Sequence, residues 1–140
     1  MLLVKTYIAP SKINGTGLYS KDFIKKGTCI WEFNPKFDRV IKKDEINEYL
    51  KECSPIIKDW LKHYAYYEKD GNKYILCMDD AKFTNHSDTP NSDEIDKNRT
   101  MAFMNIYPGE EITSNYYEFD DEAELKLNGK LEKIVTQNGM

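Results

Sequence analysis

The sequence predicts a single α+β domain, mostly β, in which many short strands accompany one helical insert. The chain has 140 residues, which is enough for one hydrophobic core and too few for two domains of ordinary size. Along most of its length, short segments rich in β-branched and aromatic residues alternate with Gly and Pro turns. Only between about residues 43 and 66 does the apolar spacing change to the helical period.

The first third of the chain reads as β structure. Residues 2–9 and 28–33 are rich in β-branched and aromatic side chains, and Pro10, Gly27 and Pro35 bound them. The segment between them contains two glycines, a short strand and a turn that closes at Gly27. We therefore expect two strands joined by a glycine-rich connection.

The helical insert is expected over about residues 36–73. Apolar residues recur there at i, i+3, i+4 and i+7, first at Ile46, Tyr49, Leu50 and Cys53 and then at Ile57, Trp60, Leu61 and Tyr64. Ser54 is a good N-cap, and Pro55 suits the first position of a helix. The pattern predicts two short helices, the second of which begins after Ser54.

The remaining chain returns to short strands. We expect strands at residues 74–78, 100–105 and 111–114, with a polar, irregular segment after the first of them. Residues 120–126 have a helical pattern that Asn128-Gly129 interrupts. We divide the chain into a folded domain at residues 1–119 and a C-terminal helical segment and tail at 120–140.

Composition excludes several classes of protein. Hydrophobic residues make up 40% of the chain and aromatic residues 13%, which excludes a disordered chain. No apolar run approaches the roughly eighteen residues of a membrane span, so we expect no membrane association. The three cysteines show no paired spacing, so we expect no disulfide and a cytoplasmic location. Because there are only two histidines, we also expect no metal site.

Charge is unevenly distributed along the chain. Residues 1–43 carry nine Lys/Arg against three acids, whereas residues 79–96 carry six acids and one lysine. Residues 110–124 hold seven acids and no base. This pattern disfavours direct nucleic-acid binding and is compatible with a basic ligand on the acidic side, although solvated loops explain it equally well.

Three segments are too polar or glycine-rich for core packing alone. They are Gly15-Thr16-Gly17, the run FTNHSDTPN at residues 83–91, and PGEEITSNYY at residues 108–117. A lone GxG is also an ordinary tight turn, and Asn, Ser, Asp and Pro are common turn residues. A tyrosine that ends a strand is often simply amphipathic packing. Each segment alone is therefore weak evidence for a functional site.

Taken together and in this order, the three segments resemble the SET-domain family of protein-lysine methyltransferases. The resemblance runs from about Ser11 to Tyr116 and includes an intact NHSxxPN motif. It implies a SET-domain (β-clip-like) fold with a C-terminal pseudoknot, in which the NHS segment threads beneath the C-terminal segment. The chain is similar to small standalone SET proteins of the bacterial or viral kind.

The resemblance also implies a cofactor and the residues of a site. S-adenosyl-L-methionine is the methyl donor of the family, and the matching cofactor residues are Gly15, Thr16, Gly17, Asn85 and His86. Tyr116 matches the catalytic tyrosine. For the substrate channel, the resemblance implies Phe33, Ser114 and Tyr117, of which Phe33 and Ser114 stand where many members have Tyr or another aromatic residue. Phe119 and the last helix are expected to cover the adenine.

The expected function is methyl transfer to the ε-amine of a lysine in a protein substrate, within an exposed basic segment. Phe33 and Ser114 leave open an alternative, a SET-fold module of little activity that binds a basic peptide. A channel that admits lysine would also admit a small amine or polyamine. The sequence leaves the oligomeric state open.

Overall fold

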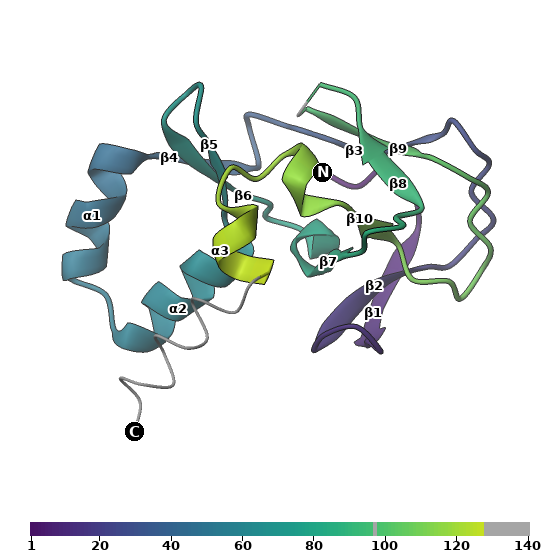
Figure 1. Cartoon of the computed structure of the whole chain (residues 1–140), viewed down its shortest axis with the longest axis horizontal. Coiled ribbons are helices and arrows are strands. Elements are labelled where there is room, and N and C mark those ends of the chain that lie inside the picture. The colour runs from purple at the N-terminus through teal and green to yellow at the C-terminus, as the bar shows by residue number, and fades with distance from the viewer. Residues whose placement is uncertain (97, 128–140) are drawn as a thin grey trace.

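The structure, a computed structural model, describes residues 1–96 and 98–127. It is built from short strands with few helices. Figure 1 shows helices α1 and α2 at one end of an elongated molecule, strands β1, β2, β3, β8 and β9 towards the other end, and β7 and β10 between them.

The end remote from the helices contains a hairpin and a three-stranded sheet. The hairpin pairs β1 (Thr6–Pro10) with β2 (Thr16–Ser20) in antiparallel register. The sheet has the order β3-β9-β8, formed by β3 (Cys29–Glu32), β9 (Arg99–Ala102) and β8 (Ser92–Glu94). Six buried side chains form a core between these elements: Leu18, Ile24, Ile30, Ala102, Ile106 and Ile112.

The insert consists of a three-stranded sheet and two helices. β4 (Arg39–Lys42) leads into α1 (Lys43–Lys51) and α2 (Pro55–Tyr64), and the chain returns through β5 (Tyr66–Glu68) and β6 (Lys73–Leu76). These strands form a sheet of order β4-β6-β5. The Ser54 hydroxyl accepts a hydrogen bond from the Ile57 N–H, as an N-cap should.

The middle of the molecule joins two segments distant in sequence. β7 (Asn85–His86) pairs in parallel with β10 (Thr113–Ser114), and the Asn91 side chain holds β10 by accepting from the Thr113 N–H at 2.9 Å. The 3₁₀ helix η1 (Asp80–Phe83) precedes β7, and η2 (Tyr116–Glu118) follows β10. This crossing is the contact that the expected pseudoknot requires.

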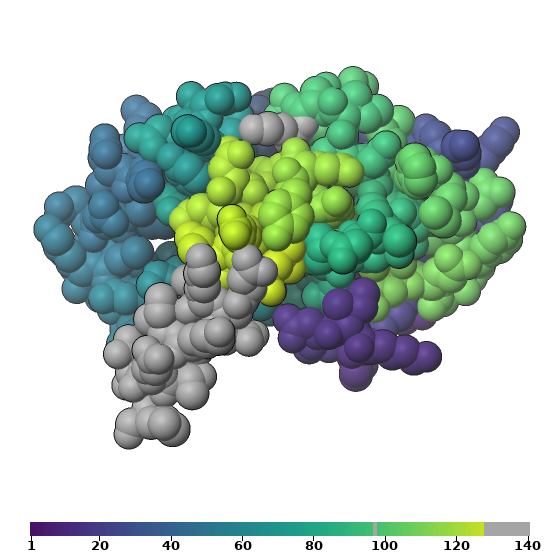
Figure 2. All heavy atoms as spheres, in the orientation of Figure 1, coloured from purple at the N-terminus to yellow at the C-terminus, as the bar shows by residue number. Residues whose placement is uncertain are grey.

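The chain ends, within the described part, in α3 (Ala123–Leu127). Figure 2 shows these C-terminal residues, in yellow-green, spread over the middle of one face between the insert and the strands of the other end. The Asp120 carboxylate accepts from the Tyr67 N–H, and the Lys126 ammonium donates to the Ala65 carbonyl, so both ends of this segment are tied to the insert.

The fold class and the two helices of the insert are predicted correctly, but several strand bounds are wrong. The first strand begins at residue 6 because residue 2 forms only an isolated bridge to Trp31. The last expected strand is shortened to β10, and the expected helix at 120–126 begins at residue 123. The interruption expected at Asn128-Gly129 lies outside the described residues. β4, β5 and β8 were missed because each has only three or four residues and forms through tertiary pairing.

Among the helices that the structure describes, none combines the length and the apolar character that crossing a membrane requires.

Candidate active site

The turn between β1 and β2 carries the expected glycine loop, and Asn85 fixes it from β7. Gly15 has a φ of +47°, a conformation that glycine adopts without strain. The Asn85 side-chain amide donates to the carbonyls of Asn14 at 3.0 Å and Thr16 at 3.3 Å. The structure therefore brings together Gly15, Thr16, Gly17 and Asn85, although some 70 residues separate the loop from Asn85 in sequence.

Glu111 completes this hydrogen-bonded cluster at the glycine loop, and sequence reasoning had not singled it out. Its carboxylate accepts from Asn85 Nδ2 at 3.0 Å and from the Ser11 hydroxyl at 2.8 and 2.9 Å. A Cβ added to Gly17 would lie 2.6 Å from Glu111 Oε2, so the carboxylate reaches the loop backbone only because residue 17 is glycine. The signal was present in the sequence, in the second Glu of PGEEIT.

His86 acts on the backbone of Tyr116. His86 Nδ1 accepts from the Tyr116 N–H at 3.1 Å, and Nε2 lies 2.8 Å from Asp88 Oδ1. Because Nδ1 is an acceptor here, the proton of the neutral ring is on Nε2, where it faces the carboxylate. The imidazole thereby links β7 to the start of η2 and holds the tyrosine that follows β10.

The Tyr116 side chain points to a backbone carbonyl near the start of β7. Its hydroxyl donates to the Thr84 carbonyl at 2.7 Å, and its ring packs against His86 and Phe119 at centroid distances of 5.3 and 5.7 Å. Burial, and then the nearby charge of Asp120, raise the pKa of the Tyr116 phenol. The phenol is therefore a neutral hydrogen-bonding group at physiological pH.

A cavity of about 80 Å³ lies beside Tyr116, between the insert and the strands of the other end. Aromatic side chains form much of its wall: Trp31, Tyr64, Tyr66, Phe119 and Tyr116 itself. Ser114 lines it as well, and its side chain is only 3% exposed. The cavity is large enough for several water molecules or a slender alkyl chain.

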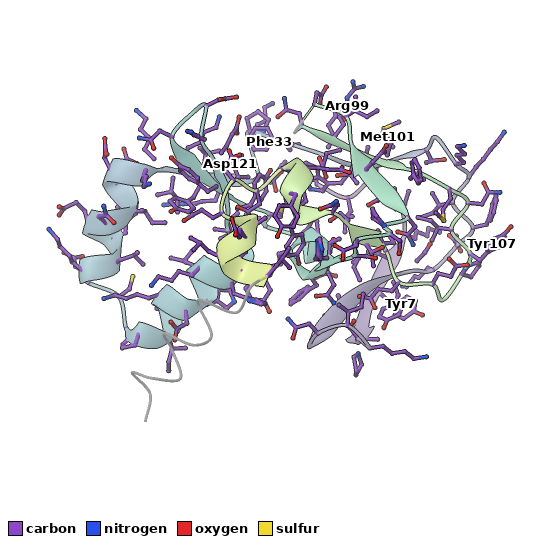
Figure 3. All side chains as sticks on the ribbon, viewed as in Figure 1. Tyr7, Phe33, Arg99, Met101, Tyr107 and Asp121 are labelled. Carbon is purple, nitrogen blue, oxygen red and sulfur yellow. The ribbon has the colours of Figure 1, made fainter. Side chains whose placement is uncertain are left out.

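Two of the three expected channel residues lie elsewhere. Phe33 is absent from the cavity lining formed by the described residues; Figure 3 shows it near the upper edge, and its N–H donates to the Asn98 carbonyl. Phe33 follows the end of β3 at Glu32, and Trp31 is the aromatic residue that this strand supplies to the cavity.

Tyr117 is also outside the cavity, because it is 56% exposed and only the edge of its ring approaches His86, at 6.0 Å between centroids. Tyr107, another tyrosine that could have filled the space beside Ser114, lies at the far edge of the molecule against Phe23 (Figure 3). Phe119, expected over an adenine, packs instead on Tyr66 and Tyr116 in the cavity wall.

A family model, the SET domain, matches residues 15–117. This match covers most of the chain, so the protein belongs to the SET-domain family. The predicted family and fold class are confirmed. A search of curated proteins gives no match.

Solved structures agree with this assignment. The chain is similar to a candidate histone methyltransferase of Plasmodium falciparum, with 29% identity, a TM-score of 0.55, and 82% of this chain and 95% of the other covered. It is also similar to DIM-5, a SET-domain histone lysine methyltransferase of Neurospora, with 19% identity, a TM-score of 0.58, and 82% and 53% covered.

A third structure is a humanized mutant of the Polycomb Repressive Complex 2 of Chaetomium thermophilum, bound to the inhibitor GSK126. Identity is 15%, the TM-score is 0.61, and 86% of this chain matches 16% of that chain. At this identity the likeness concerns the fold. The family and these neighbours support lysine methyl transfer as the general activity.

Proposed function

We propose that the protein transfers a methyl group from S-adenosyl-L-methionine to the ε-amine of a lysine in a protein substrate. The observation that carries this proposal is the placement of Tyr116. Its phenol is buried and protonated, its backbone is held by His86, and its hydroxyl lies against the Thr84 carbonyl at an aromatic cavity.

The polar groups at the glycine loop and Glu111 have the chemistry to bind the amino-acid end of the cofactor. An α-ammonium needs acceptors, and the Glu111 carboxylate and the loop carbonyls of Asn14 and Thr16 converge on Asn85 there. Gly15, Thr16, Gly17, Asn85 and His86 are the residues that would hold the cofactor. When bound, the cofactor supplies a methyl group on a cationic sulfur, which is the electrophile of the reaction.

The chain's own contribution is to desolvate and orient the amine. A lysine ammonium has an ordinary pKa of about 10.4 and attacks only after losing a proton. Enclosure by aromatic walls disfavours its charged form and lowers that pKa. The Tyr116 hydroxyl and the Thr84 carbonyl offer the amine hydrogen bonds in a fixed direction, and alignment of this kind contributes several kcal/mol to catalysis.

Acidic segments beside the cavity suit a basic substrate. The Glu94 N–H donates to Glu118 Oε2 at 2.9 Å, so the acidic stretches at residues 88–96 and 118–124 meet. Such a surface attracts a Lys/Arg-rich segment. We expect the affinity for a basic peptide to fall as added salt shortens the Debye length below about 10 Å. An affinity that does not change with added salt, or that is higher for an acidic peptide, contradicts this substrate class.

The experiment that tests the proposal follows the methyl group itself. The protein is incubated with methyl-labelled S-adenosylmethionine and a protein lysate, and the labelled proteins are hydrolysed to amino acids. We expect label on methylated lysine with the wild-type protein and almost none with Tyr116→Phe. Label on another amino acid contradicts lysine specificity. Binding of a basic peptide without any transfer supports the alternative, a module of little activity.

A further inference from the structure

One acidic side chain in the cavity is not accounted for by the site described above. Glu94 is the last residue of β8, and its side chain lines the same cavity as Tyr116 and Ser114. β8 lies directly beside β10, since the Ser92 hydroxyl donates to the Thr113 carbonyl at 2.6 Å. The chain therefore places a carboxyl group close to the residues assigned to the reaction.

The Glu94 carboxylate is only half satisfied. Oε1 accepts from the Thr100 hydroxyl at 2.5 Å. Oε2 is buried and accepts no hydrogen bond from any residue that the structure describes. A buried carboxylate oxygen without a donor is costly, so its persistence calls for a partner that binds there.

The two lysines that also line the cavity do not supply this partner. The Lys126 ammonium lies 2.6 Å from Asp120 Oδ2 and donates to the Ala65 carbonyl. Lys82 donates to the Asp79 carbonyl and lies over the Phe83 ring. Both cations are thus held elsewhere, so neither lysine supplies a donor to Glu94 Oε2. A donor from outside the chain would reach this oxygen through the cavity that Glu94 lines.

We infer that Glu94 receives the substrate amine in this cavity and takes one proton from it before methyl transfer. This inference rests on the proposed function and adds to it a proton acceptor and a requirement for a cationic substrate. The proton moves from the ammonium nitrogen to Oε2. The freed lone pair then forms the bond to the methyl carbon, the electron pair of the broken bond goes to sulfur, and Glu94 releases its proton to water.

The surroundings of Glu94 suit this role. The pKa of Glu94 is raised to about 7: burial raises it most, the hydrogen bond from Thr100 lowers it, and the charges of Glu118, Asp93 and Asp96 raise it. A base works best when its pKa lies near the working pH. Burial lowers the pKa of an incoming amine and raises that of the carboxyl, so the two values approach each other.

Other titratable groups around Glu94 do not compete for this proton. Tyr66 on β5 and Cys77 after β6 approach it from the insert, and burial raises the pKa of both. Both therefore stay protonated and neutral at physiological pH. Asp120 is engaged with Lys126, as described, and Arg99 pairs with Asp96 at 3.2 Å. The pKa of Glu94 lies near neutrality, so its carboxyl changes charge in the physiological range.

The first test uses n-butylammonium, a mimic of the lysine side chain, and needs no cofactor. The ¹³C shift of the Glu94 carboxyl is followed by NMR from pH 5 to 9, with Glu94→Gln providing the assignment. We expect a midpoint near pH 7 that falls by about one unit or more when the amine binds. We expect Glu94→Gln to bind the amine about tenfold more weakly or worse.

Glu45→Gln is the matched control. It makes the same acid-to-amide change in the first turn of α1, outside the acidic stretches at residues 88–96 and 118–124 and outside the cavity lining that the described residues form. It should bind n-butylammonium as the wild type does. Equal amine binding by wild type and Glu94→Gln, or a midpoint that the amine leaves unmoved, overturns the inference.

Methyl transfer separates this inference from the proposed function. If it is right, the wild-type rate rises with pH up to about 7, and Glu94→Gln loses both the rate and this rise. If both proteins form methyl-lysine equally well, the proposed function stands and the inference fails. If amine binding depends on Glu94 but no methyl-lysine forms with any protein substrate, the amine site stands and the proposed function fails.

Discussion

The hydrogen-bonded cluster at the glycine loop and the cavity beside Tyr116 differ in how completely their polar groups are satisfied. In the cluster, the Asn85 amide group donates to three acceptors, and the Glu111 carboxylate accepts from Asn85 and Ser11. In the cavity, Glu94 has one partner for its two oxygens. The first region is already assembled, and the second has an unused acceptor.

This difference separates scaffold from chemistry. A satisfied network fixes the shape of a pocket before a ligand arrives, which lowers the entropic cost of binding. An unsatisfied buried acceptor destabilises the folded protein, and this free energy is recovered only when a donor binds to the acceptor. The predictions below test this contrast in order of decreasing free energy.

The largest effect is expected on stability. The pKa of Glu94 is about 7 in the folded state against an ordinary 4.5, so the folded state holds its proton more tightly than the unfolded state does. Wild-type stability should therefore fall as pH rises from about 4.5 to 7 and then level off, losing at most about 3 kcal/mol from this group.

Urea unfolding of Glu94→Gln measures this effect. The variant should match the wild type at low pH and be more stable than it above pH 7, because the amide carries no charge. Asp93→Asn should leave the pH dependence largely in place. A wild-type protein that gains stability over this pH range contradicts the unpaired state of Glu94.

Tyr116→Phe is expected to act mainly on turnover. In the proposed reaction the hydroxyl orients the substrate amine, so its loss should lower kcat by about 100-fold, or about 2.7 kcal/mol. The loss of its hydrogen bond to Thr84 should cost only about 1 kcal/mol of folding stability. Tyr117→Phe, on an exposed ring, is the control. Unchanged kcat in Tyr116→Phe removes this phenol from the mechanism.

Asn85→Ala should break the assembled region. It removes three hydrogen bonds and leaves the Glu111 carboxylate without its amide donor, so we expect a loss of about 2 kcal/mol in the free energy of unfolding. The thermal upshift on adding S-adenosylhomocysteine should vanish. Asn105→Ala, which removes a single exposed acceptor for the Lys26 N–H, should keep the upshift.

The smallest effect concerns product distribution. Ser114 is small and buried in the cavity wall, and neither Phe33 nor Tyr117 fills the space beside it. We expect products beyond monomethyl-lysine with the wild type and a shift towards monomethyl-lysine in Ser114→Tyr. Mass spectrometry of the modified peptides at long times measures this. Products that stop at monomethyl-lysine in both proteins contradict a roomy cavity.

The motif order of the sequence predicts which segments meet, and packing decides which side chains line the cavity. The glycine loop, Asn85 and His86 come together because the pairing of β7 with β10 follows the motif order. Phe33 follows the end of β3 and lies outside the cavity lining of the described residues, whereas Trp31 within the strand lines it. In the sequence, Glu94 is one of six acidic residues between residues 79 and 96. Only its burial in the folded protein distinguishes it from the others.

The most direct test of the central claim is a calorimetric titration of S-adenosylhomocysteine into wild type, Gly17→Ala and Gly27→Ala. A Cβ at residue 17 must displace the Glu111 carboxylate, whereas one at residue 27, outside the glycine loop, meets nothing within 4 Å and only strains the backbone. We predict binding by the wild type, binding by Gly27→Ala, and none by Gly17→Ala. Absence of binding by the wild type, or equal binding by all three proteins, contradicts a cofactor pocket at this loop.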